Sequence, residues 1–197
     1  MRYDGLLDEL ILTYKGMLTS RMMDEHGIPR RELQALVECG KVIKKDRGLY
    51  VVKGYQEDPL VYGAYHYSKG IYDLTSVMFI YGYTSHPDQL TMAFPSHTNI
   101  SQIHSPYIQP FTVNALRYKN GVRQMRTPLK TVIHYYGLSY ALVHMIMRKN
   151  DIDPRLIQQW FIRFIRENGI DALVSAAREL RVESKLKKYL MGLDHMR

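Results

Sequence analysis

The 197-residue sequence contains a single cysteine, Cys39. One cysteine cannot form an intramolecular disulfide, and a cysteine-based zinc site, which needs several thiolates, is excluded with it. The longest apolar runs fall far short of the roughly 18 residues that span a bilayer, and the N-terminus lacks the apolar run of a signal peptide. From these absences we expect a cytoplasmic protein without a membrane partner.

Motifs of hydrolytic, metal and nucleotide chemistry are also missing. The sequence has no Gly-x-Ser-x-Gly, no His-Glu-x-x-His and no glycine-rich phosphate loop. His86, His97 and His104 fall in a polar stretch over 84–110, which we interpret as a hydrogen-bonding loop; the other reading is a nucleic-acid-processing enzyme. His134 and His144 lie in an apolar segment that reads as helix, and we interpret them as core or interface residues. We expect no enzyme activity, no catalytic residue, no metal and no cofactor.

Positive charge is in excess and is unevenly distributed. The formal net charge is +8 and the sequence pI is about 9.5. Residues 1–53 contribute +2, residues 54–116 contribute −3 and residues 117–197 contribute +9. A basic balance favours a polyanionic partner, either nucleic acid or an anionic membrane surface, and we expect nucleic acid. Because the excess lies near the C-terminus, we expect additional phosphate contacts there, with Arg178, Arg181, Lys185 and Lys188 as candidates.

The pattern over residues 1–54 predicts three short helices followed by a β-hairpin. Apolar residues recur at helical spacing over 3–15, a short second helix is expected over 21–26, and a third follows Pro29 and ends at Gly40. Two short strands flank a tight turn at 46–48. This order is typical of a winged helix-turn-helix, whose third helix enters the major groove of DNA.

The residues expected to contact DNA lie on the third helix, the hairpin and the start of the second helix. Arginine can pair with guanine through two hydrogen bonds and glutamine with adenine, so the third helix suits direct base reading. Hairpin cations would meet phosphate. The candidates are Arg30, Arg31 and Gln34 for bases, Lys41, Lys44, Lys45 and Arg47 on the hairpin, and Ser20 and Arg21 at helix two.

A glycine, a proline and a change of charge over residues 53–59 predict a boundary before a second domain, residues 60–197. There we expect a helix over 60–83, strands at about 90–95 and 111–118, and a turn at Asn120-Gly121. Helices are expected from about residue 128, over 128–148, 153–168, 169–180 and 182–192. The predicted class is α+β, mostly helical, with an N-terminal winged helix-turn-helix, a small sheet and a helical end.

Several segments resemble the AbiEi-family antitoxins of bacterial type IV toxin–antitoxin systems. They are Arg31–Val42 with Asp46–Tyr50, Asp73–Thr84, Leu90–Pro95, Thr127–Val132 and Ala177–Leu186. Together they cover nearly the whole chain in the family's order. The sequence departs from the family at Tyr72–Thr75, where relatives often have a Ser-His-type sequence, so no role follows for these side chains.

The resemblance implies a two-domain antitoxin associated with abortive infection by phage. The N-terminal domain would bind inverted repeats in double-stranded operator DNA and repress its own operon. The C-terminal domain would counteract a nucleotidyltransferase-like toxin without a stable complex. A monomer or weak dimer, cooperative on DNA, fits this role. The alternative is a winged-helix transcriptional regulator of another operon with a C-terminal sensing domain.

Overall fold

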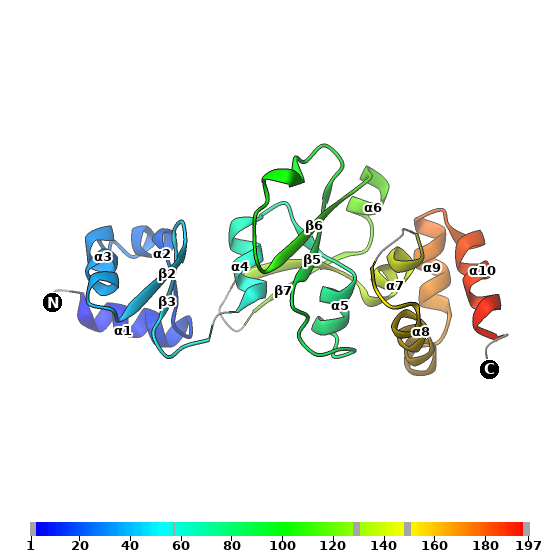
Figure 1. Cartoon of the computed structure of the whole chain (residues 1–197), viewed down its shortest axis with the longest axis horizontal. Helices are drawn as coiled ribbons and strands as arrows, with labels where there is room; N and C mark the ends of the chain where they lie inside the picture. Colours follow the sequence, from blue (N-terminus) through cyan, green and yellow to red (C-terminus); the bar gives the residue numbers. More distant parts are fainter. Residues whose placement is uncertain (1–2, 57, 128–130, 148–150, 195–197) are drawn as a thin grey trace. The chain divides into compact units, whose positions relative to one another are not determined.

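The computed structural model describes residues 3–56, 58–127, 131–147 and 151–194. The chain is an α+β protein, about half helical, with two small sheets and a helical C-terminal end (Figure 1). It divides into two compact units, one of residues 1–66 with 126–132 and one of residues 67–125 with 133–197. Within the described ranges, no helix is long and apolar enough to cross a membrane.

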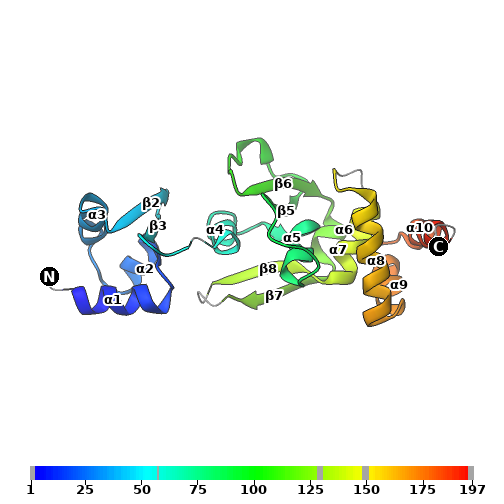
Figure 2. The same ribbon diagram turned by 60° about the horizontal axis from the view of Figure 1, so that its bottom comes forward.

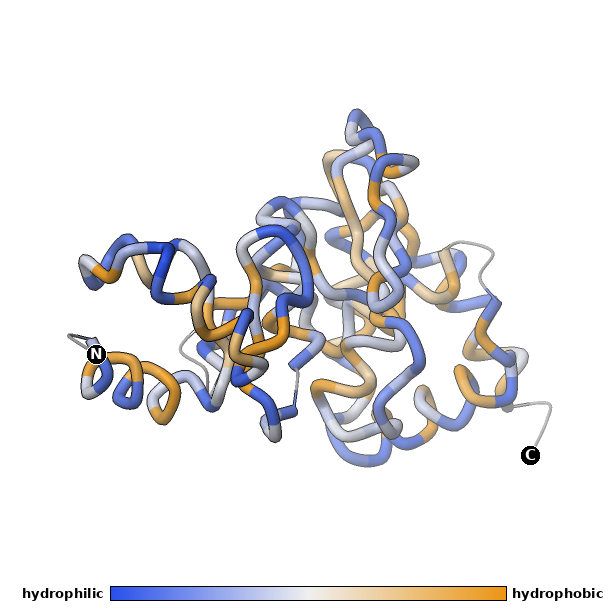
Figure 3. Tube along the Cα trace, turned by 60° about the vertical axis from the view of Figure 1, so that its left-hand side comes forward, coloured by the Kyte–Doolittle hydropathy of each residue, from blue (hydrophilic) through white to orange (hydrophobic). Residues whose placement is uncertain are grey.

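The first unit combines short helices with a three-stranded sheet. Its first helices are α1 (Asp4–Thr13), α2 (Ser20–Glu25) and α3 (Arg30–Glu38). The strands β1 (Met17–Thr19), β2 (Val42–Asp46) and β3 (Leu49–Val52) form an antiparallel sheet in the order β1-β3-β2. Hydrophobic and hydrophilic residues alternate along α1, which begins near the label N in Figure 3. Apolar side chains from these elements form one core of Leu7, Leu10, Leu18, Met23, Ile28, Leu33 and Val42.

Local chemistry explains the boundaries of these elements. The hydroxyl of Thr19 caps α2 by accepting a hydrogen bond from the backbone N–H of Met22 at 3.1 Å. Gly48 adopts φ +75° between β2 and β3, a left-handed conformation that favours glycine. The three helices and the hairpin agree with the sequence prediction. Strand β1 was not predicted, because three residues are too few to show a periodic pattern.

Helix α4 (Pro59–His66) also belongs to the first unit. The Tyr62 hydroxyl donates to Asp46 Oδ2 at 2.8 Å, and the Tyr65 hydroxyl donates to the Gly48 carbonyl at 3.2 Å. These bonds tie α4 to the β2–β3 turn. The chain therefore divides after residue 66, whereas the sequence places the boundary between residues 54 and 60.

The second unit is built on a five-stranded sheet in the order β6-β5-β4-β8-β7. Strand β5 runs parallel to β6, β4 runs parallel to β8, and β4 and β5 are antiparallel. The strands are β4 (Ile71–Tyr72), β5 (Leu90–Pro95), β6 (Ile108–Val113), β7 (Val122–Arg126) and β8 (Val132–Tyr136).

Helices occupy the connections and the C-terminal end of this unit. The connections hold α5 (Thr75–Ile80), the 3₁₀ helix η1 (Ile100–Gln102) and α6 (Ala115–Lys119). The C-terminal end consists of α7 (Leu138–Met147), α8 (Pro154–Asn168), α9 (Asp171–Glu179) and α10 (Glu183–Asp194). In Figures 1 and 2 these last four helices gather at one end of the sheet. Their apolar faces share one core with β4, β5, β6 and β8.

Three segment predictions for this region are wrong. The helix expected over 60–83 is replaced by α4, β4 and α5, because residues 71–72 pair with β5 and Gly70 packs against Met92. The strand expected over 111–118 ends at Val113, because Asn114 caps α6 by accepting from the Arg117 N–H at 2.9 Å. The helical region expected from residue 128 begins only at Leu138.

Residues 132–136 form strand β8, in which exposed and buried side chains alternate from Val132 to His134. Residues 128–130 lie outside the described ranges. The remaining helix, strand and turn positions predicted for this unit agree with the structure. Strand β5 covers 90–95, the turn at Gly121 has φ +75°, and α8 begins at Pro154 after the capping residue Asp153.

Candidate nucleic-acid interface

The first turn of α3 presents two arginines with different surroundings. The Arg30 guanidinium binds Asp24, at the end of α2, through Nε–Oδ1 at 3.2 Å and Nη2–Oδ2 at 2.7 Å. This hydrogen bonding lowers the pKa of Asp24. The side chain of Arg31 is 81% exposed, and its Nε lies 3.7 Å from Glu32 Oε1, too far for a hydrogen bond. Arg30 therefore joins α3 to α2, whereas Arg31 is available to an external partner.

Two further candidates pair with acidic residues of their own helices. Gln34 Nε2 donates to Glu38 Oε1 at 3.1 Å along α3. Arg21 Nε donates to Glu25 Oε1 at 2.7 Å along α2. All four side chains are on exposed residues, so water competes with these pairs, and a bound phosphate or base could replace them at small cost.

The β2–β3 hairpin and the residue before it carry the four other cations that the sequence predicts as DNA contacts. An irregularity in β2 lies between Lys44 and Asp46. The carboxylate of Asp46 accepts from the Arg47 N–H at 2.6 Å and from the Tyr62 hydroxyl, and these hydrogen bonds lower its pKa. His66 Nε2 lies 3.8 Å from the same carboxylate. The exposed cations are Lys41, Lys44, Lys45 and Arg47.

The structure links the predicted contact elements to one another. Ser20, half-buried at the start of α2, donates its backbone N–H to the carbonyl of Gly48 at 2.9 Å. This bond attaches the start of α2 to the hairpin turn. Together with the Arg30–Asp24 pair, it brings α2, α3 and the hairpin into one connected group.

The C-terminal candidates are all exposed and lie in the second unit. Arg178 is near the end of α9, and Arg181, with φ +57°, lies between α9 and α10. Lys185 and Lys188 lie on α10, and both line a groove between α8 and α10. The four cations are thus spread over two helices and their connection.

Sequence patterns missed a buried ionic cluster in the second unit. Asp73 Oδ2 accepts from Arg117 Nη2 and from His144 Nδ1, each at 2.9 Å, and the side chains are 0%, 6% and 0% exposed. Burial opposes ionisation of Asp73, but the two partners and the Leu74 N–H together lower its pKa. Burial lowers the pKa of His144, so the neutral imidazole donates from Nδ1. The cluster is buried, and its geometry fits structural support of β4 and α7.

The histidines flagged by sequence are distributed over the second unit. The core interpretation of His144 is confirmed by its complete burial. His134 is an exposed residue of β8, so its placement on an apolar helix is wrong. His86 contacts the ring of Phe79, with centroids 4.8 Å apart. Among the described residues, no three His, Cys, Asp or Glu side chains are grouped to hold a metal ion.

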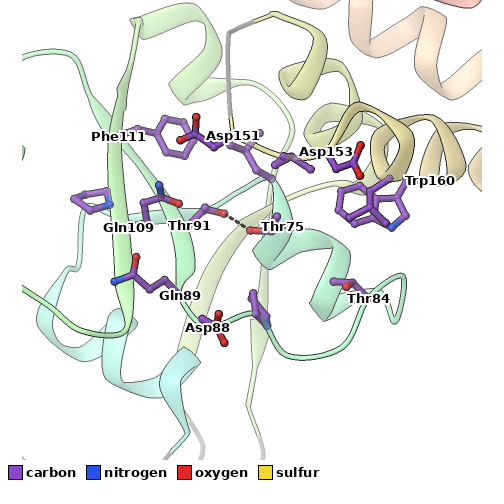
Figure 4. Close-up of a pocket in the computed structure, with 15 residues that line it drawn as sticks. Thr75, Thr84, Asp88, Gln89, Thr91, Gln109, Phe111, Asp151, Asp153 and Trp160 are labelled. Atoms are coloured by element: carbon purple, nitrogen blue, oxygen red, sulfur yellow. Dashed lines mark hydrogen bonds between the residues drawn. The ribbon is translucent and has the colours of Figure 1, made fainter.

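A cleft of about 450 Å³ lies where α5, β5, β6 and α8 begin (Figure 4). The hydroxyls of Thr75 and Thr91 are 3.3 Å apart there, and Thr91 also donates to the carbonyl of Asp73. The cleft is lined by Asp88, Asp151 and Asp153, and its described lining includes no Lys or Arg. Such a lining repels phosphate, so the cleft is unsuited to nucleic acid and suits a small polar or cationic molecule.

Comparisons with known proteins show a likeness in fold and none in sequence family. No family model and no curated protein matches the sequence. Among solved structures, the chain is similar to the crystal structure of the RV2827C protein from Mycobacterium tuberculosis, with 14% sequence identity and a TM-score of 0.53. The match covers 93% of this chain and 80% of that chain. The likeness therefore spans both units and concerns their fold alone.

Proposed function

We propose that the first unit is a winged helix-turn-helix that binds double-stranded DNA, with α3 in the major groove and the β2–β3 hairpin as the wing. One observation supports this most strongly. The connected group of α2, α3 and hairpin presents Arg31, 81% exposed, in the first turn of α3, where helix-turn-helix proteins contact bases.

The surroundings of each residue suggest its role in this complex. Arg31 and Gln34 read base edges, while Arg30 orients α3 through Asp24 and can reach a backbone phosphate. Ser20, Arg21 and the hairpin cations contact phosphate. Arg178, Arg181, Lys185 and Lys188 are proposed as additional phosphate contacts from the second unit.

The test is DNA binding measured by fluorescence anisotropy. The probes are a duplex from upstream of the protein's own operon and a scrambled duplex of equal length and composition. We expect tighter binding to the upstream duplex, and loss of that preference in Arg31→Ala. The matched control is Arg166→Ala, which changes an exposed arginine of α8 outside the proposed interface. Equal affinity of the wild type for both duplexes would contradict operator recognition.

We further propose that the protein is a bacterial type IV antitoxin and autorepressor. The support is the resemblance to AbiEi-family antitoxins along the chain. In a co-expression assay, the protein should restore growth to cells that express a nucleotidyltransferase-like toxin from the adjacent open reading frame. Arg31→Ala should lose repression of the operon and keep the rescue, because the second unit is proposed to counteract the toxin. Failure of the wild type to rescue growth would refute the antitoxin role.

The second candidate is a transcriptional regulator of another operon whose second unit senses a ligand. The acidic cleft of the second unit favours it, because a hollow of this size accommodates a small molecule. Operator binding without rescue of growth would support this candidate.

A further inference from the structure

The helical end of the second unit contains a groove of about 680 Å³ between α8 and α10. Ile146 of α7 and Tyr189 and Leu193 of α10 give it an apolar wall. The ring of Tyr189 also packs on Phe161, with centroids 4.7 Å apart, which holds this wall in place. Volumes of this order are typical of small-molecule sites, roughly 300–1,000 Å³.

Cations border the apolar wall. Lys185 and Lys188 are three positions apart on α10 and so lie on the same side of that helix. Arg155 borders the groove from the first turn of α8. One carboxylate, Asp153, is also among the lining residues, and it caps α8 by accepting from the Arg155 N–H at 2.8 Å. The charged groups of the described lining thus carry a net positive charge.

Cations beside an apolar wall distinguish the groove from a surface that contacts only phosphate. A DNA backbone needs cations and gains little from an apolar wall behind them. Lys185 and Lys188 were predicted from sequence as phosphate contacts, and the structure places them beside Tyr189 and Leu193. An anion that also carries hydrocarbon would use both the charges and the wall.

We propose that this groove binds an amphiphilic organic anion, such as a medium-chain carboxylate. Lys185, Lys188 and Arg155 bind the anionic end, and the hydrocarbon lies along Ile146, Tyr189 and Leu193. The site uses no residue of the first unit, but it shares Lys185 and Lys188 with the additional phosphate contacts proposed above. It would give the second unit a ligand whether that unit serves an antitoxin or another regulator.

The test is calorimetric titration of the full chain with laurate below its micelle-forming concentration. Dodecanol serves as the neutral probe of equal chain length, and phosphatidylglycerol vesicles as the membrane-bound source of the same chemistry. We expect saturable binding of laurate, with dodecanol at least tenfold weaker. Binding to vesicles without binding to free laurate would overturn the proposal in favour of a membrane surface.

Two variants test the charges and the wall separately. Lys185→Glu/Lys188→Glu should weaken laurate binding at least tenfold, whereas Lys187→Glu, on the same helix but outside the lining, should leave it unchanged. Gly192→Phe should block the groove without altering charge, because Gly192 lines it. A Cβ at Gly192 meets no atom within 4 Å, so the fold has room for the start of the new side chain. Equal loss in Lys187→Glu, or full binding in Gly192→Phe, would overturn the proposal.

The same variants separate this site from DNA binding. If Lys185→Glu/Lys188→Glu weakens operator binding while the wild type binds no laurate, the two lysines are phosphate contacts and the groove proposal fails. If laurate binds as expected and the operator does not bind at all, the groove stands and the proposed function fails.

Discussion

Neighbouring residues of the same type have different roles when their partners differ, as Arg30 and Arg31 show. Arg30 is bound by Asp24 through two hydrogen bonds, whereas Arg31 is 81% exposed and its Nε lies 3.7 Å from Glu32 Oε1, beyond hydrogen-bond distance. We therefore expect Arg31→Ala to cost about 1–3 kcal/mol on the operator, roughly a 5- to 150-fold loss of affinity. Anisotropy on operator duplexes with single base changes checks this. A loss that is uniform across sequences would instead make Arg31 a phosphate contact.

A second residue-scale prediction concerns His144 and acid. Its pKa in the folded protein is lowered by burial, while in the unfolded chain it is about 6.5. Below that pH the unfolded state binds more protons, so the free energy of unfolding falls as the pH drops below about 6.5. Urea unfolding at pH 7.5 and 5.5, followed for the second unit, should show this loss.

His144→Asn is the matched variant for this measurement. Asparagine can still donate to Asp73 but cannot titrate, so the stability of the second unit should depend less on pH. The pKa of His66 in the first unit is also lowered by burial, and it contributes in the same direction there. An unchanged pH dependence in His144→Asn would contradict the assignment of a neutral His144.

At the scale of elements, α4 acts as a support for the hairpin. Tyr62→Phe keeps the ring and removes the hydroxyl that donates to Asp46. We expect a loss of stability of about 1 kcal/mol and a several-fold loss of DNA affinity, because the hairpin turn is held less firmly. Thermal unfolding and anisotropy measure the two effects. Tyr55→Phe, an exposed tyrosine of the same unit, is the control and should match the wild type.

Sequence signals predict elements whose causes are local. The hairpin turn at Gly48, the start of α8 at Asp153-Pro154 and its end at Gly169 each depend on one or two residues and were predicted. Strand β4 and the ionic cluster were missed, because their stability depends on partners far along the chain. Asp73 is 44 positions from Arg117 and 71 from His144, and spacing alone cannot pair them.

The candidate site likewise has features that the sequence predicts and features that depend on residues far apart in the chain. Its residue types and their elements follow from sequence, since helix α3 and the hairpin are local structures. The pairing of Arg30 with Asp24, which leaves Arg31 without a hydrogen-bonded carboxylate, depends on how α2 and α3 pack and is not visible in the sequence. The groove beside Lys185 and Lys188 is also not visible in the sequence, because α8 and α10 are brought together only by the tertiary fold.

At the scale of the whole molecule, salt dependence separates the contributions of the two units. The exposed cations proposed for the first unit are Arg21, Arg30, Arg31, Lys41, Lys44, Lys45 and Arg47. Displacement of counterions by these seven gives a slope of log K against log salt of at most about −6. With Arg178, Arg181, Lys185 and Lys188 included, the steepest slope becomes about −10.

Per bound copy of the protein, a measured slope steeper than about −6 would require cations beyond these seven, and the second unit is proposed to supply them. Arg178→Glu/Arg181→Glu should then reduce its magnitude, with Lys187→Glu as the control for added negative charge. Anisotropy at four or more salt concentrations gives the slope. A slope within the limit of the first unit that does not change in the double variant would contradict phosphate contacts by Arg178 and Arg181.

The first unit is built from two separate stretches of the chain, and this affects the design of chimeric proteins. Residues 126–132 are grouped with residues 1–66, so the chain passes between the two units after residues 66, 125 and 132. A chimera that exchanges this unit for that of a relative therefore needs three junctions, because one cut near residue 66 would leave a segment of the old unit behind. If DNA specificity is exchanged by a single crossover near residue 66, we expect residues 1–66 of one protein to pack against residues 126–132 of the other, without matching contacts.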